Sequence, residues 1–456
     1  MTFSSVIFLF IFLPVTFALY CISVKDSIRN ILLVLASLIF YAFGEPVAVF
    51  IMIVSVIINY FLGLAAAGEK HQKLAVFSAV VLNIGLLLAF KYTGFFAGLL
   101  NDVLPVSIPV PKIRLPIGIS FFTFQGLSYV IDVYRDKKSV QKKLMSVLLY
   151  ISFFPQLIAG PIVKYHDIEA QLHTRELTAD RVSRGVNRFI IGLGKKVLIA
   201  NQMGLVADTV FSLDADKLGM GAAWVGAVCY SLQIFFDFSG YSDMAIGLGC
   251  MFGFDFKENF NYPFSAGSMQ DFWRRWHISL STWFKEYVYI PLGGNRKGKL
   301  RTDINKLIVF FLTGFWHGAN FTFIVWGLSH GFFLLLENHG IIPSKSKRLK
   351  PLLHIYTLLV VIVTFVIFRA DTLTQGVKVI AKMFSFTSGS ADATVFAMLN
   401  ALVITAFVFG AVLSTPVVPF IKDKLSKTKA MPAAEYAGYT GTLVIFALCV
   451  LSLISS

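Results

Sequence analysis

Residues 47–66 read VAVFIMIVSVIINYFLGLAA, an apolar run without a charged side chain, and stretches of this kind decide the fold. A helix needs about 20 apolar residues to cross the hydrocarbon core of a bilayer. Because lipid offers the backbone no hydrogen-bond partners, such a segment crosses it as a helix. The stretch therefore predicts a membrane-spanning helix.

Comparable runs recur along the whole chain. Of the 456 residues, 56% are hydrophobic and 14% are charged, against roughly 25% charged residues in an ordinary soluble protein. This composition excludes the soluble, disordered, collagenous and disulfide-rich classes. It predicts an all-α, polytopic integral membrane protein with roughly 11–13 transmembrane or re-entrant helices. The runs lie near residues 4–24, 30–66 (broken at Gly44-Glu45-Pro46), 74–96, 115–133, 145–163, 186–210, 220–253, 304–321, 322–338, 352–369, 394–420 and 438–455.

The net charge of +15 has a membrane explanation. Lys and Arg collect on cytoplasmic loops that face anionic lipid, so we expect membrane lipid, and not nucleic acid, as the partner of this charge. The four cysteines stand in apolar surroundings without a Cys-x-x-Cys pair, and we expect neither a disulfide set nor a metal site. They are Cys21, Cys229, Cys250 and Cys449.

A dense polar segment, residues 268–286, interrupts the apolar sequence. Ser268 and Asp271 have the spacing of a capping box, so the segment predicts a helix that starts there. Asp271 and Arg275 stand four residues apart and can pair along one side of this helix.

The aromatic residues of this segment follow the same helical spacing. Trp273 and His277 are four residues apart and would share one face, whereas Trp276 and Trp283 are seven apart and would share another. Indoles and charges on several faces fit the wall of a wet cavity. They equally fit an interfacial aromatic belt with snorkelling arginines.

Residues 312–322 place a histidine inside an apolar run. His317 has small neighbours such as Gly318, which let a substrate or another backbone approach. If the segment is helical, Thr313 or Asn320 can orient the imidazole. An imidazole is the natural proton acceptor for a hydroxyl or thiol near neutral pH. The alternative is a buried histidine that only hydrogen-bonds a neighbour.

Residues 233–245 contain two carboxylates, Asp237 and Asp243, within apolar sequence. Ionisable groups at membrane depth are costly and usually face a partner or a cavity. The pair therefore belongs to a structural polar network or to an ion or proton path. His330 is a further candidate for a cavity histidine.

Taken together, several stretches resemble the membrane-bound O-acyltransferase superfamily, and more narrowly its bacterial alginate O-acetyltransferase branch. They follow the family's order between residues 115 and 320, and the sequence from 341 to 456 carries no recognised motif. The stretches are LPIGISF (115–121) with YVIDVYR (129–135), FPQLIAGP (154–161), FDFSGYSDMAIG (236–247), FWRRWHISLSTW (272–283), LGGNRKG (292–298) and FWHGAN (315–320).

The resemblance implies one multi-pass membrane domain over residues 1–456, with helices around a central cavity and a catalytic core at 115–340. His317 corresponds to the family's catalytic histidine, and His277 to the second histidine of the family pattern. The expected supporting or orienting residues are Asn320, Trp316, Asp271, Arg274, Arg275 and Trp276.

The implied reaction is acyl transfer across the bacterial cytoplasmic (inner) membrane. Acetyl-CoA would donate the acetyl group without any bound cofactor, and Arg296 and Lys297 would attract its phosphates. The acceptor would be an extracytoplasmic polysaccharide such as alginate, reached through a periplasmic SGNH-type acetyltransferase partner. His317 would act as general base or carry the acyl group itself.

Three other functions remain open on the sequence alone. One is D-alanyl transfer from a carrier protein to teichoic acid. Another is an ion-coupled transporter or flippase that uses the buried carboxylates. The third is an acyltransferase directed at a lipid.

Overall fold

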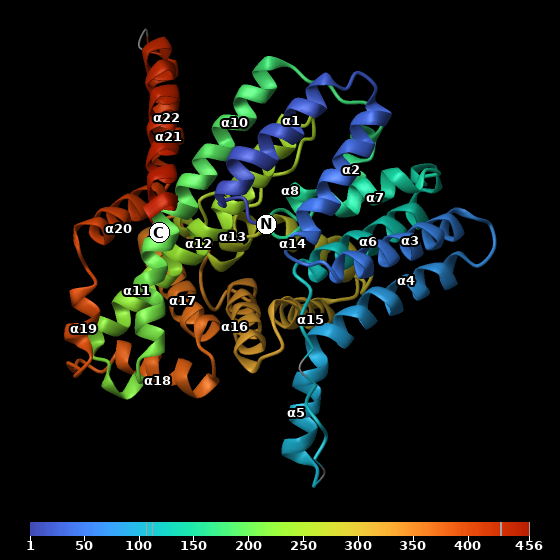
Figure 1. The fold of residues 1–456 in the computed structure, drawn as a ribbon. Coiled ribbons are helices and arrows are strands. Elements are labelled where there is room, and N and C mark those ends of the chain that lie inside the picture. The colour runs from blue at the N-terminus through green and yellow to red at the C-terminus, as the bar shows by residue number, and fades with distance from the viewer. Residues whose placement is uncertain (106, 112, 429–430, 456) are drawn as a thin grey trace. The chain divides into compact units, whose positions relative to one another are not determined.

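The computed structural model describes residues 1–105, 107–111, 113–428 and 431–455. Within these ranges every regular element is a helix, and none is a strand (Figure 1). The chain packs as two compact units. Unit 1 comprises Met1–Phe189 and Ser242–Glu258, and unit 2 comprises Ile190–Tyr241 and Asn259–Ser456.

Seven helices of the described chain are long and apolar enough to cross a membrane, and a bent pair would make an eighth. The pair, α20 (Ala401–Leu413) and α21 (Val417–Ser426), bends by 60° at its break. The prediction of an all-α, multi-pass membrane protein is confirmed. The seven spans are Ala48–Ala67, Gln72–Val103, Ala179–Ser212, Met220–Met251, Phe321–Asn338, Lys350–Arg369 and Ala434–Ser455.

Some predicted apolar runs form shorter helices than one crossing requires. The run at 145–163 divides at Phe153, whose ψ of 115° ends α7 (Leu144–Ser152) before the short helix α8 (Phe154–Leu157). Pro155 explains the division, since proline lacks the backbone N–H that a continuing helix would use.

Buried polar contacts add to the apolar packing between the helices of unit 1. The amides of Asn59 on α3 and Asn83 on α4 bond each other at 2.9 Å, deep inside the unit. A Cβ at Gly126 of α6 would collide with Asn59, so this glycine lets α6 approach. The helices are α1 (Leu13–Ile22), α2 (Asp26–Ala42), α3 (Ala48–Ala67), α4 (Gln72–Leu87), α5 (Thr93–Val103), α6 (Ile119–Arg135), α7, α8 and α9 (Tyr165–Ile168).

Two long helices, α10 (Ala179–Gly194) and α12 (Met220–Met251), contribute residues to both units. The other helices of unit 2 are α11 (Asn201–Ser212), α13 (Met269–Arg275), α14 (Ile278–Phe284), α15 (Lys299–His317), α16 (Phe321–Asn338), α17 (Lys350–Arg369), α18 (Leu373–Met383), α19 (Asp392–Ala397), α20, α21 and α22 (Met431–Ser455).

Helices α15 and α16 form a tight hairpin in unit 2 and lie side by side in Figure 1. A Cβ at Gly314 would collide with the carbonyl oxygen of Phe323, and a Cβ at Gly327 with that of Phe310. The two backbones therefore touch, as small residues allow in membrane helices. This crossing fixes His317, the last residue of α15.

Candidate active site

Helix α13 begins where the sequence predicts. The Ser268 hydroxyl accepts a hydrogen bond from the Asp271 N–H at 3.0 Å, and Asp271 pairs with Arg275 at 2.9 Å. A second cap comes from Glu337 of α16, whose carboxylate accepts the N–H groups of Met269 (2.6 Å) and Gln270 (3.1 Å). Glu337 was not among the predicted site residues, although a glutamate in the last turn of an apolar helix signals a buried partner.

The prediction that one helix carries both Trp273 and His277 is wrong. Helix α13 ends at Arg275, and His277 has a left-handed backbone (φ 44°, ψ 54°) before α14 begins at Ile278. The backbone of residues 259–261 supplies partners for the broken helix: Asn261 N–H donates to Arg275, and Ile278 N–H donates to Asn259. Trp273 and His277 therefore share no helical face.

The hydrogen bonds around His277 fix its tautomer. Asn259 Oδ1 lies 3.2 Å from the backbone N–H of Ser279 and 3.2 Å from His277 Nδ1. A backbone N–H can only donate, so this Asn259 atom is an oxygen, and Nδ1 of the neutral imidazole is the donor. Nε2 of His277 then carries the lone pair. Nε2 is buried and has no hydrogen-bond partner among the described residues.

The surroundings keep His277 neutral. It lies outside the helices that qualify as membrane spans, yet its side chain is buried. Burial lowers the pKa of His277 well below its ordinary value, and the nearby His317 lowers it further. A neutral imidazole with an available Nε2 can accept a hydrogen bond.

The structure brings the two predicted histidines together. The ring centroids of His277 and His317 lie 6.4 Å apart, although the two residues come from different segments of unit 2. Three aromatic rings surround His317, with centroids at 5.0 Å for Trp316, 5.3 Å for Trp326 and 5.2 Å for Phe368. The arrangement is a pair of imidazoles walled by aromatic side chains.

Asn320 lies beyond the end of α15, because residues 318–320 are not helical. Its side-chain oxygen accepts the Thr322 N–H at 3.1 Å, and its Nδ2 donates to the Asp371 carbonyl at 2.8 Å. Asn320 or Thr313 was expected to orient His317 if the segment were one continuous helix. The helix ends before Asn320, so this condition does not hold there. Thr313 donates to the Val309 carbonyl at 2.8 Å.

The other predicted supporting residues divide by exposure. Trp276 is buried and stacks on Phe272 with centroids 5.5 Å apart, whereas Arg274 is exposed. Arg296 and Lys297 are also exposed, in a loop between helices. Because Asn305 donates to the Gly294 carbonyl at 2.9 Å, this loop is anchored to α15.

His330 differs from the histidine pair because both of its nitrogens are used. The Trp273 indole, which can only donate, reaches His330 Nδ1 at 3.3 Å. Nε2 is then protonated and donates to the Thr364 hydroxyl at 3.0 Å. His330 is therefore a structural histidine that fixes the wall of indoles.

The two carboxylates of α12 each have a cationic partner. Asp237 pairs with Lys196 at 2.6 Å in unit 2, and Asp243 pairs with Arg188 at 2.8 Å in unit 1. Paired charges are what a structural polar network requires.

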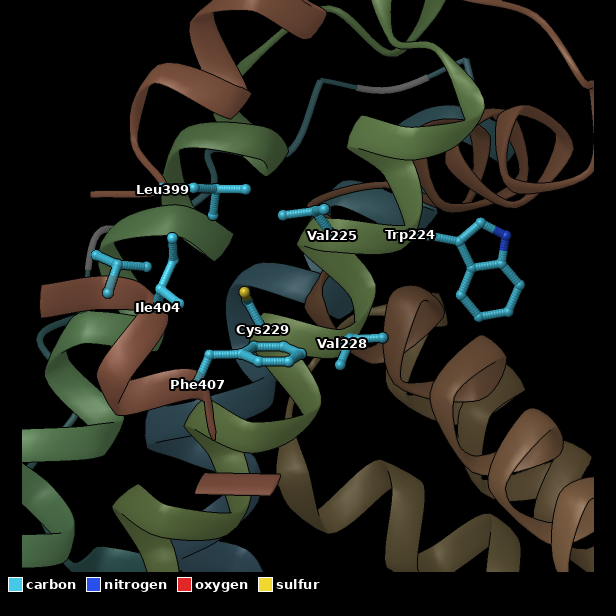
Figure 2. Close-up of a pocket in the computed structure, with 8 residues that line it drawn as sticks. Trp224, Val225, Val228, Cys229, Leu399, Ile404 and Phe407 are labelled. Atoms are coloured by element: carbon cyan, nitrogen blue, oxygen red, sulfur yellow. The ribbon is translucent and has the colours of Figure 1, made fainter. Parts of the chain in front are cut away.

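An apolar cavity of about 270 Å³ lies elsewhere in unit 2 (Figure 2). Its described lining residues are apolar apart from the Cys229 thiol and include no histidine or carboxylate. The Trp224 indole donates to the Met383 carbonyl at 2.7 Å. The candidate site is therefore the histidine pair. This cavity is lined by Trp224, Val225, Val228 and Cys229 of α12 and by Leu399, Val403, Ile404 and Phe407.

Known proteins resemble this chain over most of its length. The probable alginate O-acetylase of Pseudomonas putida is 43% identical over 394 residues, which cover 85% of this chain and 81% of the relative. The peptidoglycan O-acetyltransferase of Helicobacter pylori is 37% identical over 420 residues, 84% of this chain and 79% of the relative. The teichoic acid D-alanyltransferase of Bacillus subtilis is 30% identical over 262 residues, 55% of this chain and 65% of the relative.

The model of the membrane-bound O-acyltransferase family matches residues 69–377, which include both histidines. With a match this long and relatives this similar, the chain belongs to the membrane-bound O-acyltransferase family and is a multi-pass membrane enzyme that transfers acyl groups to oxygen.

Proposed function

We propose that this enzyme transfers acetyl groups from cytoplasmic acetyl-CoA, across the bacterial inner membrane, to an extracytoplasmic polysaccharide. The observation that carries the proposal is the approach of His277 and His317 to 6.4 Å within a membrane chain. The names of its relatives support acetyl as the acyl group and polysaccharides as acceptors.

In this proposal His317 is the catalytic base. It accepts the proton of the attacking hydroxyl, or it attacks the thioester itself and carries the acetyl group briefly. His277 supports it with the lone pair of Nε2, which burial keeps unprotonated. Trp316 and Trp276 exclude water from the pair, while Asp271 and Arg275 hold the helix that precedes His277.

The polysaccharide would be acetylated through a periplasmic acetyltransferase of the SGNH type. Alginate is the substrate named for the Pseudomonas relative and peptidoglycan for the Helicobacter relative, so a carbohydrate acceptor suits both. D-alanyl transfer has weaker support, because the Bacillus relative matches only 55% of this chain. The transporter alternative has no support, because the family of this chain consists of O-acyltransferases.

Complementation tests the proposal. In cells that lack the native protein, wild type restores acetylation of the secreted polysaccharide, and His317→Ala at matched expression abolishes it. His277→Ala lowers it strongly. His339→Ala, an exposed histidine that pairs with Asp303, is the matched control and retains activity.

Full acetylation with His317→Ala would exclude His317 as the catalytic base. If wild type itself restores no acetylation, the acetyl–polysaccharide assignment fails. D-alanyl esters in cell-wall extracts of the same cells would then support D-alanyl transfer.

The loop at residues 292–298 gives a second prediction. Because Arg296 and Lys297 are exposed and cationic, replacing both with Gln weakens attraction of the CoA phosphates. We expect KM for acetyl-CoA to rise by up to about 30-fold at low salt, with little change in kcat. Replacing the exposed Lys345 and Lys347 with Gln is the control. An unchanged KM in the loop variant would remove the donor-binding role.

A further inference from the structure

Helix α16 carries a row of buried polar side chains on one face. Thr322, Trp326 and His330 follow one another at intervals of four residues, and Glu337 lies two turns further on. Residues with this spacing share a face of a helix. The row therefore runs the length of α16 inside unit 2.

The half of the row near the C-terminus of α16 is satisfied. Both nitrogens of His330 are hydrogen-bonded, and both carboxylate oxygens of Glu337 accept N–H groups of α13. The half near the N-terminus is not. Trp326 Nε1 and Thr322 Oγ1 are buried and have no hydrogen-bond partner among the described residues. A buried donor without a partner is costly, so a protein retains one where something else satisfies it.

Of the two unsatisfied donors, Trp326 lies beside the candidate catalytic histidine. The Trp326 ring is 5.3 Å from that of His317, with the planes at 88°. Thr322 stands one helical turn before Trp326, in the first turn of α16, which follows the short connection after His317. Thr322 is 0% exposed and Trp326 is 1% exposed.

We propose that Trp326 Nε1–H and Thr322 Oγ1–H donate hydrogen bonds to the carbonyl oxygen of the acyl thioester. This inference rests on the proposed acetyl transfer and names two catalytic residues for it. Negative charge develops on that oxygen in the transition state of acyl transfer, and fixed donors in a water-poor site stabilise it.

The acceptor hydroxyl oxygen bonds to the carbonyl carbon as His317 takes its proton, and the carbonyl π electrons move to the oxygen held by the two donors. The C=O bond then re-forms and the C–S bond breaks. The departing thiolate takes the proton from His317, so an ester and a free thiol leave the site.

The indole is rigidly held for this task. Its ring packs against Phe368 (4.9 Å between centroids) and His330 (5.0 Å), and His330 is itself fixed by two hydrogen bonds. An indole N–H can only donate, so it favours an oxyanion over a cation. Thr322 is held through its backbone N–H by Asn320.

Two conservative substitutions test the proposal. Trp326→Phe removes the N–H and keeps an aromatic ring, and Thr322→Val removes the hydroxyl and keeps the branched shape. In membranes containing the full chain, release of the CoA thiol from acetyl-CoA is followed together with acetylation of the polysaccharide. We expect each variant to lower kcat by about 100-fold while KM for acetyl-CoA changes little.

Matched controls separate a lost donor from a damaged fold. Thr322→Ser restores the hydroxyl and keeps most of the activity. Trp224→Phe removes an indole N–H that bonds the Met383 carbonyl far along the chain from His317, and it retains wild-type kcat. If Trp326→Phe does not fold, as judged by thermal unfolding, the Thr322 pair decides.

The outcomes are distinct. Wild-type kcat in folded Trp326→Phe and Thr322→Val, with wild type active, would overturn the donor pair and leave the proposed function intact. Equal loss in Thr322→Ser and Thr322→Val would also overturn the role of that hydroxyl. Absence of thiol release by wild type would contradict the acetyl-CoA reaction itself.

Discussion

His277 has a backbone conformation that costs any residue with a Cβ, since φ is 44°. A side chain in this region costs roughly 1–2 kcal/mol relative to glycine. We therefore expect His277→Gly to be more stable than His277→Ala by about 1 kcal/mol, although both lose the imidazole. Thermal unfolding of the purified variants in detergent measures the difference.

The helical position Thr282 supplies the control for this comparison. There the order should reverse, with Ala more stable than Gly by about 1 kcal/mol. Equal stabilities of His277→Gly and His277→Ala would mean that the left-handed turn relaxes when the imidazole is removed.

The lowered pKa of His277 also links stability to pH. The unfolded chain binds a proton at this side chain below about pH 6.5, whereas the folded chain does not until the pH is far lower. The stabilising contribution is therefore present above about pH 6.5 and is lost as the pH falls. We expect the melting temperature of wild type to drop more steeply between pH 7 and pH 5 than that of His277→Gln. Parallel curves for the two proteins would contradict a neutral His277.

At the residue scale, the sequence predicted what depends on near neighbours. The Ser268 cap and the Asp271–Arg275 pair follow from spacing along one helix, and both are confirmed. The break at His277 depends on backbone partners at residues 259–261, which no local pattern reveals. The tautomer of His277 was out of reach for the same reason.

At the scale of elements, the α15–α16 hairpin depends on two glycines that face the other helix. A methyl group at Gly327 would collide with the Phe310 carbonyl oxygen. We expect Gly327→Ala to push the helices apart, to cost about 1–3 kcal/mol of stability and to reduce acyl transfer, because His317 ends α15.

Gly438 of α22 is the matched control, since a Cβ there meets no atom within 4 Å. Gly438→Ala should leave stability unchanged or slightly raise it. Thermal unfolding and thiol release, measured on both variants, decide whether the tight crossing matters. Gly327→Ala with wild-type stability would show that the hairpin has slack.

Element boundaries were predictable only where hydropathy changes sharply. The span Met220–Met251 matches the apolar run at 220–253 closely. The run at 145–163 is equally apolar, but a local break before Pro155 divides it. Average hydropathy indicates whether a segment prefers lipid to water. It does not indicate whether the backbone of that segment stays helical throughout.

At the scale of the whole molecule, the composition alone predicted an integral membrane protein, and the motifs predicted the family. Neither predicted that the chain packs as two units with α10 and α12 contributing to both. The meeting of His277 and His317 follows from the family pattern and not from hydropathy, because segments far apart in sequence must fold before the rings meet.

The polar row of α16 has one more consequence. Helix α16 packs Trp326 against His317, and its His330 accepts a hydrogen bond from Trp273. Its Glu337 accepts the N–H of Met269 at the start of α13, the helix that precedes His277. The positions of both imidazoles therefore depend on the same helix, α16. A small movement of α16 along its axis would displace both rings together. The relative position of His277 and His317 therefore depends on one helix.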